Sequence, residues 1–352
     1  MDFNLTEDRR MLSDSLSRFL ADKYAFEHRS KVAYDAPFHD PALWGELAEL
    51  GVLYALAGED QGGFGGAGFD ITTVFEALGR GLCPEPVLAT LMASRLLTAA
   101  GEDQTALLDG SRRYAVAIGE LDAPYALEGI ETRAEGRTLT GRKSVIYGGN
   151  DAELFLVAAK SGDGIGLYEV AAAEAQITGY GMIDGGGAAE LFLDATPARE
   201  VLADATEALN DALDAGALAL CAEAVGLMDA AKDLLLDYLR TRKQFGRPIG
   251  SFQALQHRAV DVVTQIEQAR SITIYAASRM GEPDQSRAVS MAKTLIGQAA
   301  RLVAEEAIQM HGGIAMTWEA AISHYGKRLV MLDAQLGDTD FHLERVMDGN
   351  AA

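Results

Sequence analysis

The chain has 352 residues, of which 30 are Lys or Arg and 52 are Asp or Glu, so its formal net charge is −22 at pH 7. This length allows one large unit or about two domains. The acidic excess argues against a nucleic-acid-binding protein and against docking on anionic membranes. No run of about 18 apolar residues occurs, so no membrane insertion is expected. The N-terminus has no recognisable export signal. Cys83 and Cys221 lie in apolar segments with a helical period, as buried reduced thiols do, so we expect a cytoplasmic protein.

The first third of the chain has a helical period. Thr6 precedes Glu7 and Asp8, which predicts an N-cap followed by an acidic first turn. The glycine-rich stretch 58–70 lacks the Lys-Ser/Thr pair of a phosphate-binding loop, so we interpret it as a connecting loop rather than a phosphate cradle. Further helices are expected near 41–51, 71–81 and 86–99.

Between about residues 113 and 195 the period changes to two. Short alternating or β-branched runs are separated by Gly and Asp, which predicts an antiparallel barrel or sandwich. The runs are Tyr114–Ile118, Arg137–Arg142, Ser144–Tyr147, Leu154–Ala158, Gly166–Val170 and Ala189–Leu193.

After about residue 205 the helical period returns and holds almost to the end. Long helices joined by short turns predict a bundle of antiparallel helices, with segments at about 206–241, 251–281, 286–311 and 317–347. The predicted fold class is therefore α+β, with three domains. These are an N-terminal helical domain (1–112), a middle antiparallel β-barrel or sandwich domain (113–204) and a C-terminal four-helix bundle (205–352).

Two stretches of the last third are unusual. Residues 240–250 read RTRKQFGRPIG, which places four cations and Phe245 at the end of a helix. The cations either complement the helix dipole or form an anion clamp, in which a guanidinium holds a diphosphate beside an apolar wall. Residues 309–315 read QMHGGIA, where the paired glycines either cap a helix or let a ligand approach the backbone closely.

These stretches, RKQFGRPIGSFQALQHRAVDV (242–262) and AIQMHGGIAMTWE (307–319), together with the helix–β–helix order, closely resemble the acyl-CoA dehydrogenase family of flavoproteins. The resemblance implies a C-terminal bundle that builds dimers and tetramers, with FAD between the β domain and the bundle. It also implies that Arg242 contacts the FAD diphosphate across the dimer interface and that Phe245 packs on the cofactor. The cofactor-binding residues implied are Arg242, Phe245, Gln253, Gln309, Gly312 and Gly313, and no metal site is expected.

The chemistry implied by the resemblance is α,β-dehydrogenation of an acyl-CoA thioester. A carboxylate removes the α-proton, a hydride passes from the β-carbon to the flavin, and the electrons leave to an electron-transfer flavoprotein. In such an enzyme the flavin supplies the redox chemistry, while the protein supplies orientation and a base.

The chain departs from the family pattern at the base. Members carry a glutamate either after the last bundle helix, which corresponds to Gln335, or early in the first bundle helix, which corresponds to Gly216 with Ala217 in place of an arginine. A glutamine amide cannot accept the proton. The loop that contacts the flavin ring, here Ile118–Asp122, is shortened. This pattern, with GDTDFHLERV (337–346), resembles base-lacking small subunits such as that of pimeloyl-CoA dehydrogenase and those of steroid side-chain degradation.

The sequence thus predicts an FAD-dependent acyl-CoA dehydrogenase, as the small subunit of a two-component enzyme that supplies half of the FAD site to a larger subunit. Two alternatives stay open: a self-sufficient homo-oligomeric dehydrogenase with a relocated carboxylate base, and a cofactor-free scaffolding subunit. The catalytic residue is unassigned. Carboxylates that could replace the base, each also interpretable as a helix cap or surface acid, are Asp333, Asp338, Asp340 and Glu319. Glu120 is a further candidate, as the acid retained in the degenerate flavin loop.

Overall fold

The computed structural model describes residues 6–162 and 164–349. Their contacts divide the chain into two compact units. Unit 1 comprises Met1–Phe26, Ile71–Cys83 and Ala217–Ala352, and unit 2 comprises Glu27–Asp70 and Pro84–Gly216. The order of short helices, then strands, then long helices agrees with the predicted α+β fold class. The domain boundaries at 112/113 and 204/205 stay predictions.

Unit 2 contains an eight-stranded sheet and short helices. The strand order is β6-β7-β3-β2-β4-β5-β8, with β1 paired to β4. Most pairs are antiparallel, but β1 and β2 both pair with β4 in parallel, so the sheet is mixed. The strands are β1 (Tyr114–Ala117), β2 (Arg133–Glu135), β3 (Thr138–Tyr147), β4 (Leu154–Ser161), β5 (Gly164–Ala171), β6 (Gln176–Gly181), β7 (Gly187–Pro197) and β8 (Arg199–Leu202).

The two predicted runs around residue 143 form one strand, β3, with a bulge. The pairing of β3 with β7 shifts register between Lys143 and Ile146. Val145 lies in this gap with φ of 51°, a conformation that β-branched residues rarely adopt. The bulge interrupts the alternation, which is why the sequence reads as two separate strands.

The helices of unit 2 begin and end at recognisable signals. In α3 (Pro41–Glu49) the Asp40 carboxylate accepts hydrogen bonds from the N–H groups of Ala42 and Leu43, as an N-cap does. The other helices are α2 (Phe26–Val32), α5 (Val87–Ala100) and α6 (Thr105–Leu108).

The glycine-rich stretch is a connecting loop, as predicted. Its Gly63 and Gly65 N–H groups donate to Gly58 and Ala57 within the loop, so they are not turned toward a phosphate.

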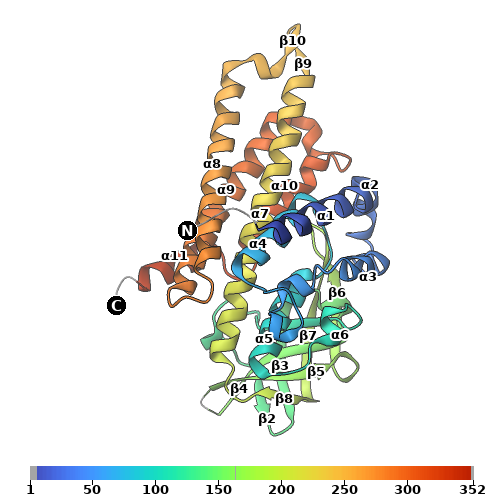
Figure 1. The fold of residues 1–352 in the computed structure, drawn as a ribbon, viewed down its shortest axis with the longest axis vertical. Coiled ribbons are helices and arrows are strands. Elements are labelled where there is room, and N and C mark those ends of the chain that lie inside the picture. The colour runs from blue at the N-terminus through green and yellow to red at the C-terminus, as the bar shows by residue number, and fades with distance from the viewer. Residues whose placement is uncertain (1–5, 163, 350–352) are drawn as a thin grey trace. The chain divides into compact units, whose positions relative to one another are not determined.

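Unit 1 is helical. Its helix α9 (Gln285–His311) packs against α8 (Gln253–Ser278), α10 (Ala321–Asp333) and α11 (Thr339–Asp348). The other helices are α1 (Glu7–Lys23), α4 (Gly68–Arg80) and α7 (Thr206–Thr241), of which α4 and α7 begin in unit 2. At the N-terminus of α1, the Thr6 hydroxyl accepts a hydrogen bond from Arg9 N at 3.4 Å, which confirms the predicted cap. The helices α7 and α8 are joined by a short hairpin at the top of Figure 1.

The last predicted helix, 317–347, is divided in two. A turn separates α10 from α11, and in it Leu336 and Gly337 have φ of 55° and 103°. The Asp338 side chain then accepts a hydrogen bond from Phe341 N and caps α11. A helical period alone does not reveal such a break, because the apolar residues continue on both sides of it.

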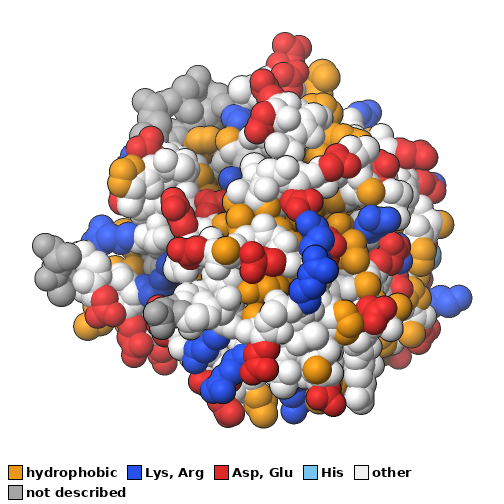
Figure 2. Space-filling model, turned by 90° about the horizontal axis from the view of Figure 1, so that it is seen from below, with side chains coloured by type: hydrophobic (Ala, Val, Ile, Leu, Met, Phe, Trp, Pro, Cys, Tyr) orange, Lys and Arg blue, Asp and Glu red, His pale blue; other side chains and the backbone are white. Residues whose placement is uncertain are grey.

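Acidic and basic side chains are mixed on one face of the molecule (Figure 2). On the face shown in Figure 2, acidic and basic side chains are interspersed and apolar side chains lie between them. This face therefore offers no continuous basic surface of the kind that binds nucleic acid. Within the described residues, no helix is both long and apolar enough to cross a bilayer.

Candidate functional site

The first unusual stretch folds as a hairpin between α7 and α8. Strands β9 (Lys243–Gln244) and β10 (Arg247–Pro248) pair antiparallel, with Gln244 opposite Arg247. The two residues of the turn, Phe245 and Gly246, have φ of 52° and 77°. Two successive residues at positive φ are typical of the tight type I′ turn that joins strands in a hairpin.

Phe245 is the unexpected residue of this turn. Its side chain is 90% exposed, and it occupies a conformation that normally goes to Gly, Asn or Asp. Its ring meets Phe252 edge-on at 6.2 Å, a contact that leaves most of its surface in water. An exposed aromatic ring in a strained backbone contributes nothing to the core of its own chain, so it points to a contact with another molecule.

Four cations flank Phe245 in the sequence. The side chains of Arg240, Arg242, Lys243 and Arg247 are exposed, and none of them forms an ion pair with a carboxylate among residues 6–162 and 164–349. The Arg247 guanidinium lies over the Phe252 ring, 4.2 Å from its centroid. In a chain of net charge −22, this is a local excess of unpaired positive charge, which suits an anion.

The second unusual stretch closes α9. The helix ends at His311, and Gly312, at φ of 72°, donates its N–H to Ile308 O. A Cβ at Gly312 or Gly313 would meet no atom within 4 Å, so the backbone here faces open space. The paired glycines therefore cap the helix and also leave room for a ligand to approach the main chain.

A ring contact joins the two stretches. The rings of Tyr238, near the end of α7, and His311 are stacked with centroids 4.5 Å apart and an interplanar angle of 22°. Arg242 lies one turn beyond Tyr238, because its N–H donates to Tyr238 O at 2.9 Å. We call residues 238–253 and 309–313 the clamp end. It brings to one end of unit 1 the predicted residues Arg242, Phe245, Gln253, Gln309, Gly312 and Gly313.

The position predicted to be a vacant base lies in the turn between α10 and α11. Gln335 is 3% exposed, and its Oε1 atom has no hydrogen-bond partner among the described residues. The buried Lys293 ammonium holds this turn by donating to the carbonyl oxygens of Leu332 (2.8 Å), Asp333 (3.1 Å) and Gly337 (3.0 Å). Burial lowers the pKa of Lys293 to about 8. The turn is therefore rigidly built, but its buried side chain is an amide.

The carboxylates near this turn have structural contacts. Asp333 Oδ1 accepts hydrogen bonds from Thr339 N (3.1 Å) and Thr339 Oγ1 (2.8 Å). Asp338 Oδ1 accepts one from Phe341 N at 2.8 Å. Asp340 and Glu319 are exposed. The helix-cap interpretation thus describes Asp333 and Asp338, and the surface interpretation describes the other two.

Glu120 is enclosed by donors. Its carboxylate accepts hydrogen bonds from Glu131 N (2.7 Å), from Thr132 N (2.9 Å) and from Thr132 Oγ1 (2.7 Å). The buried Lys143 Nζ lies 2.8 Å away. The loop around it is closed, because Glu120 and Ala123 exchange both backbone hydrogen bonds. Such a carboxylate holds the loop together and has little basicity left for a substrate.

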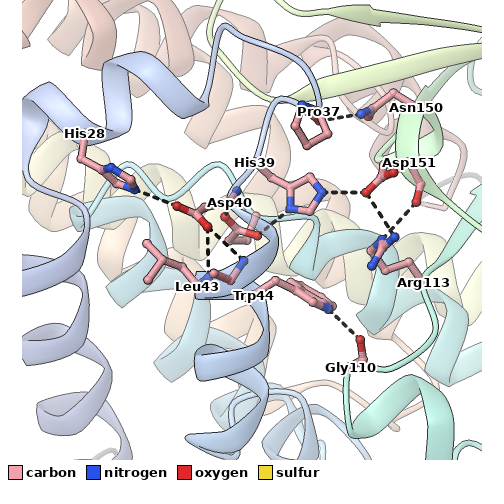
Figure 3. Close-up of polar contacts among 12 residues, drawn as sticks. His28, Pro37, His39, Asp40, Leu43, Trp44, Gly110, Arg113, Asn150 and Asp151 are labelled. Carbon is pink, nitrogen blue, oxygen red and sulfur yellow. Dashed lines mark hydrogen bonds and ion pairs between the residues drawn. The ribbon is translucent and has the colours of Figure 1, made fainter.

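Sequence reasoning missed a second polar cluster, which lies in unit 2 (Figure 3). His39 Nδ1 lies 3.1 Å from Glu85 Oε2, and Nε2 lies 2.9 Å from Asp151 Oδ2. Asp151 also pairs with Arg113 at 3.2 Å. Burial by itself lowers the pKa of His39, but its two carboxylate partners raise it overall. The local sequence around His39 favours a surface position, because it gives no sign of partners 46 and 112 residues away along the chain.

The sequence matches two family profiles: the acyl-CoA dehydrogenase N-terminal domain over residues 6–106 and the acyl-CoA dehydrogenase C-terminal domain over residues 206–349. Acyl-CoA dehydrogenase IpdE2 of Mycobacterium tuberculosis is 32% identical over 329 residues, which cover 92% of this chain and 91% of that protein. The chain belongs to the acyl-CoA dehydrogenase family. IpdE2 of Mycolicibacterium smegmatis is 29% identical over 92% of this chain and 93% of that protein.

Solved acyl-CoA dehydrogenases share the fold. A chain of the ChsE4-ChsE5 complex from Mycobacterium tuberculosis superposes with a TM-score of 0.91 at 25% identity, covering 100% of this chain and 99% of that chain. A chain of a Tcur3481-Tcur3483 steroid ACAD variant gives a TM-score of 0.89 at 29% identity, covering 98% and 99%. The predicted fold class is therefore confirmed. Membership of the family also confirms the predicted oxidoreductase class, which acts on the CH–CH bond of acyl-CoA, and the predicted cofactor, FAD.

The clamp end fits the acyl-CoA dehydrogenase cofactor. A diphosphate needs unpaired cationic donors, and the Arg242 guanidinium makes no hydrogen bond or ion pair with any described residue. A flat nucleotide needs an apolar surface, which the exposed Phe245 ring provides. Close approach to the main chain needs open backbone, which Gly312 and Gly313 provide.

Proposed function

We propose that this chain is the base-lacking small subunit of a two-component acyl-CoA dehydrogenase, and that it supplies half of an FAD site to a larger subunit. Arg242, Phe245, Gln253, Gln309, Gly312 and Gly313 are the residues that it contributes. The observation that carries the proposal is Phe245, a strained and 90% exposed ring in the same α7–α8 connection as Arg242. The ring has an edge contact with Phe252, the Arg242 guanidinium pairs with no described residue, and both groups suit a bound dinucleotide.

The missing base supports a partner subunit. Gln335 replaces the carboxylate in the turn after α10, while Gly216 and Ala217 lie buried within α7 with no ionisable group. Asp333 and Asp338 already accept hydrogen bonds from the main chain. The carboxylate that removes the α-proton of the acyl-CoA thioester then belongs to the larger subunit.

In this arrangement each residue of the clamp end has a binding role. The Arg242 guanidinium would hold the diphosphate, because its planar fork can donate two hydrogen bonds at once and a lysine ammonium cannot. Phe245 covers an apolar face of the cofactor, and the Gln253 and Gln309 amides donate at its polar edges. FAD, once bound, supplies the hydride acceptor, and an electron-transfer flavoprotein takes the electrons onward.

The relatives favour the same arrangement. One similar structure is a complex of two named proteins, ChsE4 and ChsE5, and another is the Tcur3481-Tcur3483 steroid ACAD. We extend from these to a hetero-oligomer in which the substrate is an acyl-CoA of steroid origin. Exposed apolar side chains around the clamp end and on α8, including Val260, Ile314 and Met316, offer surface for assembly.

The test is to purify the chain alone and together with a co-expressed larger acyl-CoA dehydrogenase subunit. We expect a yellow complex that reduces a dye acceptor with acyl-CoA, and no turnover by the chain alone. Full turnover by the chain alone would refute the partner claim. Protein that stays colourless in the complex and after addition of FAD would favour the cofactor-free scaffolding subunit.

The clamp itself is tested in the same complex by Arg242→Ala. Loss of a charge-assisted hydrogen bond costs about 1.5–3 kcal/mol, so FAD should dissociate roughly 10 to 100 times more readily. Arg133→Ala is the matched control, because Arg133 is an exposed arginine on β2 of unit 2. Equal FAD retention by both variants would remove the clamp end from the site.

A further inference from the structure

The two halves of the clamp end come from different helices. The hairpin with Arg242 and Phe245 continues α7, whereas Gln309, Gly312 and Gly313 close α9. A dinucleotide that touches both halves requires them at a fixed separation. The end of α7 and the end of α9 are about seventy residues apart in the sequence, so no short stretch of backbone fixes the distance between them. Contacts between the side chains at the two helix ends therefore help to set this distance. The inference that follows rests on the proposed function.

The Tyr238–His311 stack is a direct side-chain contact between these ends. Its centroid distance of 4.5 Å and interplanar angle of 22° are those of offset stacking. Each ring lies next to one half of the clamp end. Tyr238 O accepts the Arg242 N–H at 2.9 Å, and Arg242 O accepts the Ile249 N–H at 2.8 Å, so the hairpin is tied to the turn that carries Tyr238. His311 directly precedes Gly312 and lies two residues after Gln309.

The His311 ring is held in one orientation. Its Nδ1 donates to Ala307 O at 2.8 Å, because a carbonyl oxygen can only accept, and this leaves Nε2 as the acceptor nitrogen. The ring is half-buried, and burial lowers the pKa of His311, which favours the neutral form of the ring. A neutral ring with a fixed plane gives a rigid stack. In addition to the stack, Arg258 of α8 forms an ion pair with Glu306 of α9 at 2.5 Å. This pair links α8, which follows the hairpin, to the helix that carries His311.

We propose that Tyr238 and His311 are a positioning pair, which sets the separation between the Arg242 guanidinium and the open backbone at Gly312 and Gly313 so that one dinucleotide spans both. Neither residue has to touch the cofactor for this role. The pair couples the two halves: a ligand that reaches both depends on the stack, whereas a ligand that reaches only one half does not.

A positioning contact and a merely stabilising contact differ in which ligands lose affinity when the contact is removed. FAD and ADP carry both a diphosphate and an adenosine, so in the proposed site the diphosphate lies at Arg242 and the adenosine lies at the open backbone of Gly312 and Gly313. Inorganic pyrophosphate reaches only the cationic half. Loss of the stack should weaken binding of FAD and ADP about five- to tenfold, a factor within the usual range of aromatic pair energies, and leave pyrophosphate binding unchanged.

The experiment compares Tyr238→Leu, which removes the stack, with Tyr238→Phe, which keeps it, in the assembled FAD-binding complex. Calorimetric titration with ADP and with pyrophosphate is run on the cofactor-stripped complex, and FAD release is followed by fluorescence. We expect Tyr238→Leu to lose ADP and FAD affinity selectively and Tyr238→Phe to match the wild type. His311→Leu and His311→Phe repeat the comparison from α9, so an unfolded Tyr238→Leu variant does not end the test.

Two results would overturn the proposal. One is unchanged ADP and FAD affinity in folded Tyr238→Leu or His311→Leu protein. The other is equal loss of pyrophosphate and ADP affinity, which would mean that the stack only supports the fold. The proposed function fails differently: if Arg242→Ala retains FAD as the wild type does, the clamp end is not the site. If Arg242→Ala releases FAD while both Leu variants keep it, the positioning role alone is wrong.

Discussion

The Nζ atom of Lys143 lies 2.8 Å from Oε1 of Glu120, and both side chains are buried. Burial lowers the pKa of Lys143 to about 8, against the opposing effect of its partner. Burial alone raises the pKa of Glu120, but Lys143 and Thr132 lower it overall. Both Lys143 and Glu120 are therefore charged at neutral pH, and the Glu120 carboxylate stabilises the fold of its loop.

Glu120→Gln should destabilise unit 2 without acting on the chemistry directly. It leaves the Lys143 ammonium buried with neutral oxygen acceptors and no compensating charge, which costs about 3–5 kcal/mol. Urea unfolding followed by circular dichroism measures the loss. Adding Lys143→Met should recover part of it, because no unpaired charge then remains. A Glu120→Gln complex that is as stable as the wild type but catalytically dead would instead make Glu120 the catalytic base.

His39 should make stability fall as the pH rises above neutral. Its folded-state pKa is raised, so the folded state binds a proton more tightly than the unfolded chain does. The stabilisation is complete below about pH 6.5 and is lost as the pH rises through the raised pKa. His39→Gln should lower stability by about 2 kcal/mol at pH 6, the value of hydrogen bonds to charged groups, and should flatten this decline.

The measurement for His39 is the free energy of unfolding at several pH values between 5 and 9. His257→Gln, an exposed histidine on α8, is the matched control and should keep the wild-type decline. Identical pH profiles for the wild type and His39→Gln would show that the cluster in Figure 3 does not exchange a proton on unfolding.

Phe245→Gly should stabilise the isolated chain while weakening its cofactor site. A non-glycine residue at positive φ costs about 1–2 kcal/mol, and glycine removes this strain. Glycine also has more conformational freedom in the unfolded chain, which offsets part of the benefit, so we expect a net gain in stability of about 0.5–1 kcal/mol. FAD release from the complex should be faster, because the apolar wall is gone. Phe245→Ala separates the two effects: it should lose the wall without the backbone gain. A Phe245→Gly complex with unchanged FAD retention would contradict the proposed contact.

Gln335→Glu returns a carboxylate to the turn after α10. We expect no turnover of acyl-CoA by this variant alone, because the loop at residues 118–123 is closed by its own hydrogen bonds and, in the proposed function, the clamp end contributes to the site of a larger subunit. The dye-reduction assay on purified protein measures it, with Gln335→Asn as the control of similar polarity. Turnover by Gln335→Glu alone would indicate a complete site within one chain and would favour the self-sufficient dehydrogenase.

The long elements were predictable because each repeats one signal many times. The helix predicted at 206–241 is observed as Thr206–Thr241, and the one at 286–311 as Gln285–His311. The break at residues 334–338 was not predicted, since it depends on Lys293, which lies about forty residues earlier in the chain. Strand β6 was missed because its side chains are mostly exposed, so no alternation marks it.

Some residues of the candidate site were also predictable from the sequence, and others were not. Arg242, Phe245 and the paired glycines stand out as short motifs, and the resemblance to a family assigns them a role that stays a prediction. Tyr238 has no such signal: it is one aromatic residue in an apolar helix, and only the folded chain brings it onto His311. Lys143 and Lys293 were equally hidden, because lysine is rarely fully buried and sequence reasoning leaves it on the surface.

The unpaired cations of the clamp end also bear on how fast a cofactor arrives. In a chain of net charge −22, an anionic dinucleotide is repelled over most of the surface and attracted near Arg240, Arg242, Lys243 and Arg247. This attraction is screened over about 8 Å at physiological ionic strength and over less at higher salt. Concentrated salt should therefore slow the capture of FAD by the stripped complex, and the apoprotein should recover its colour soonest in dilute buffer.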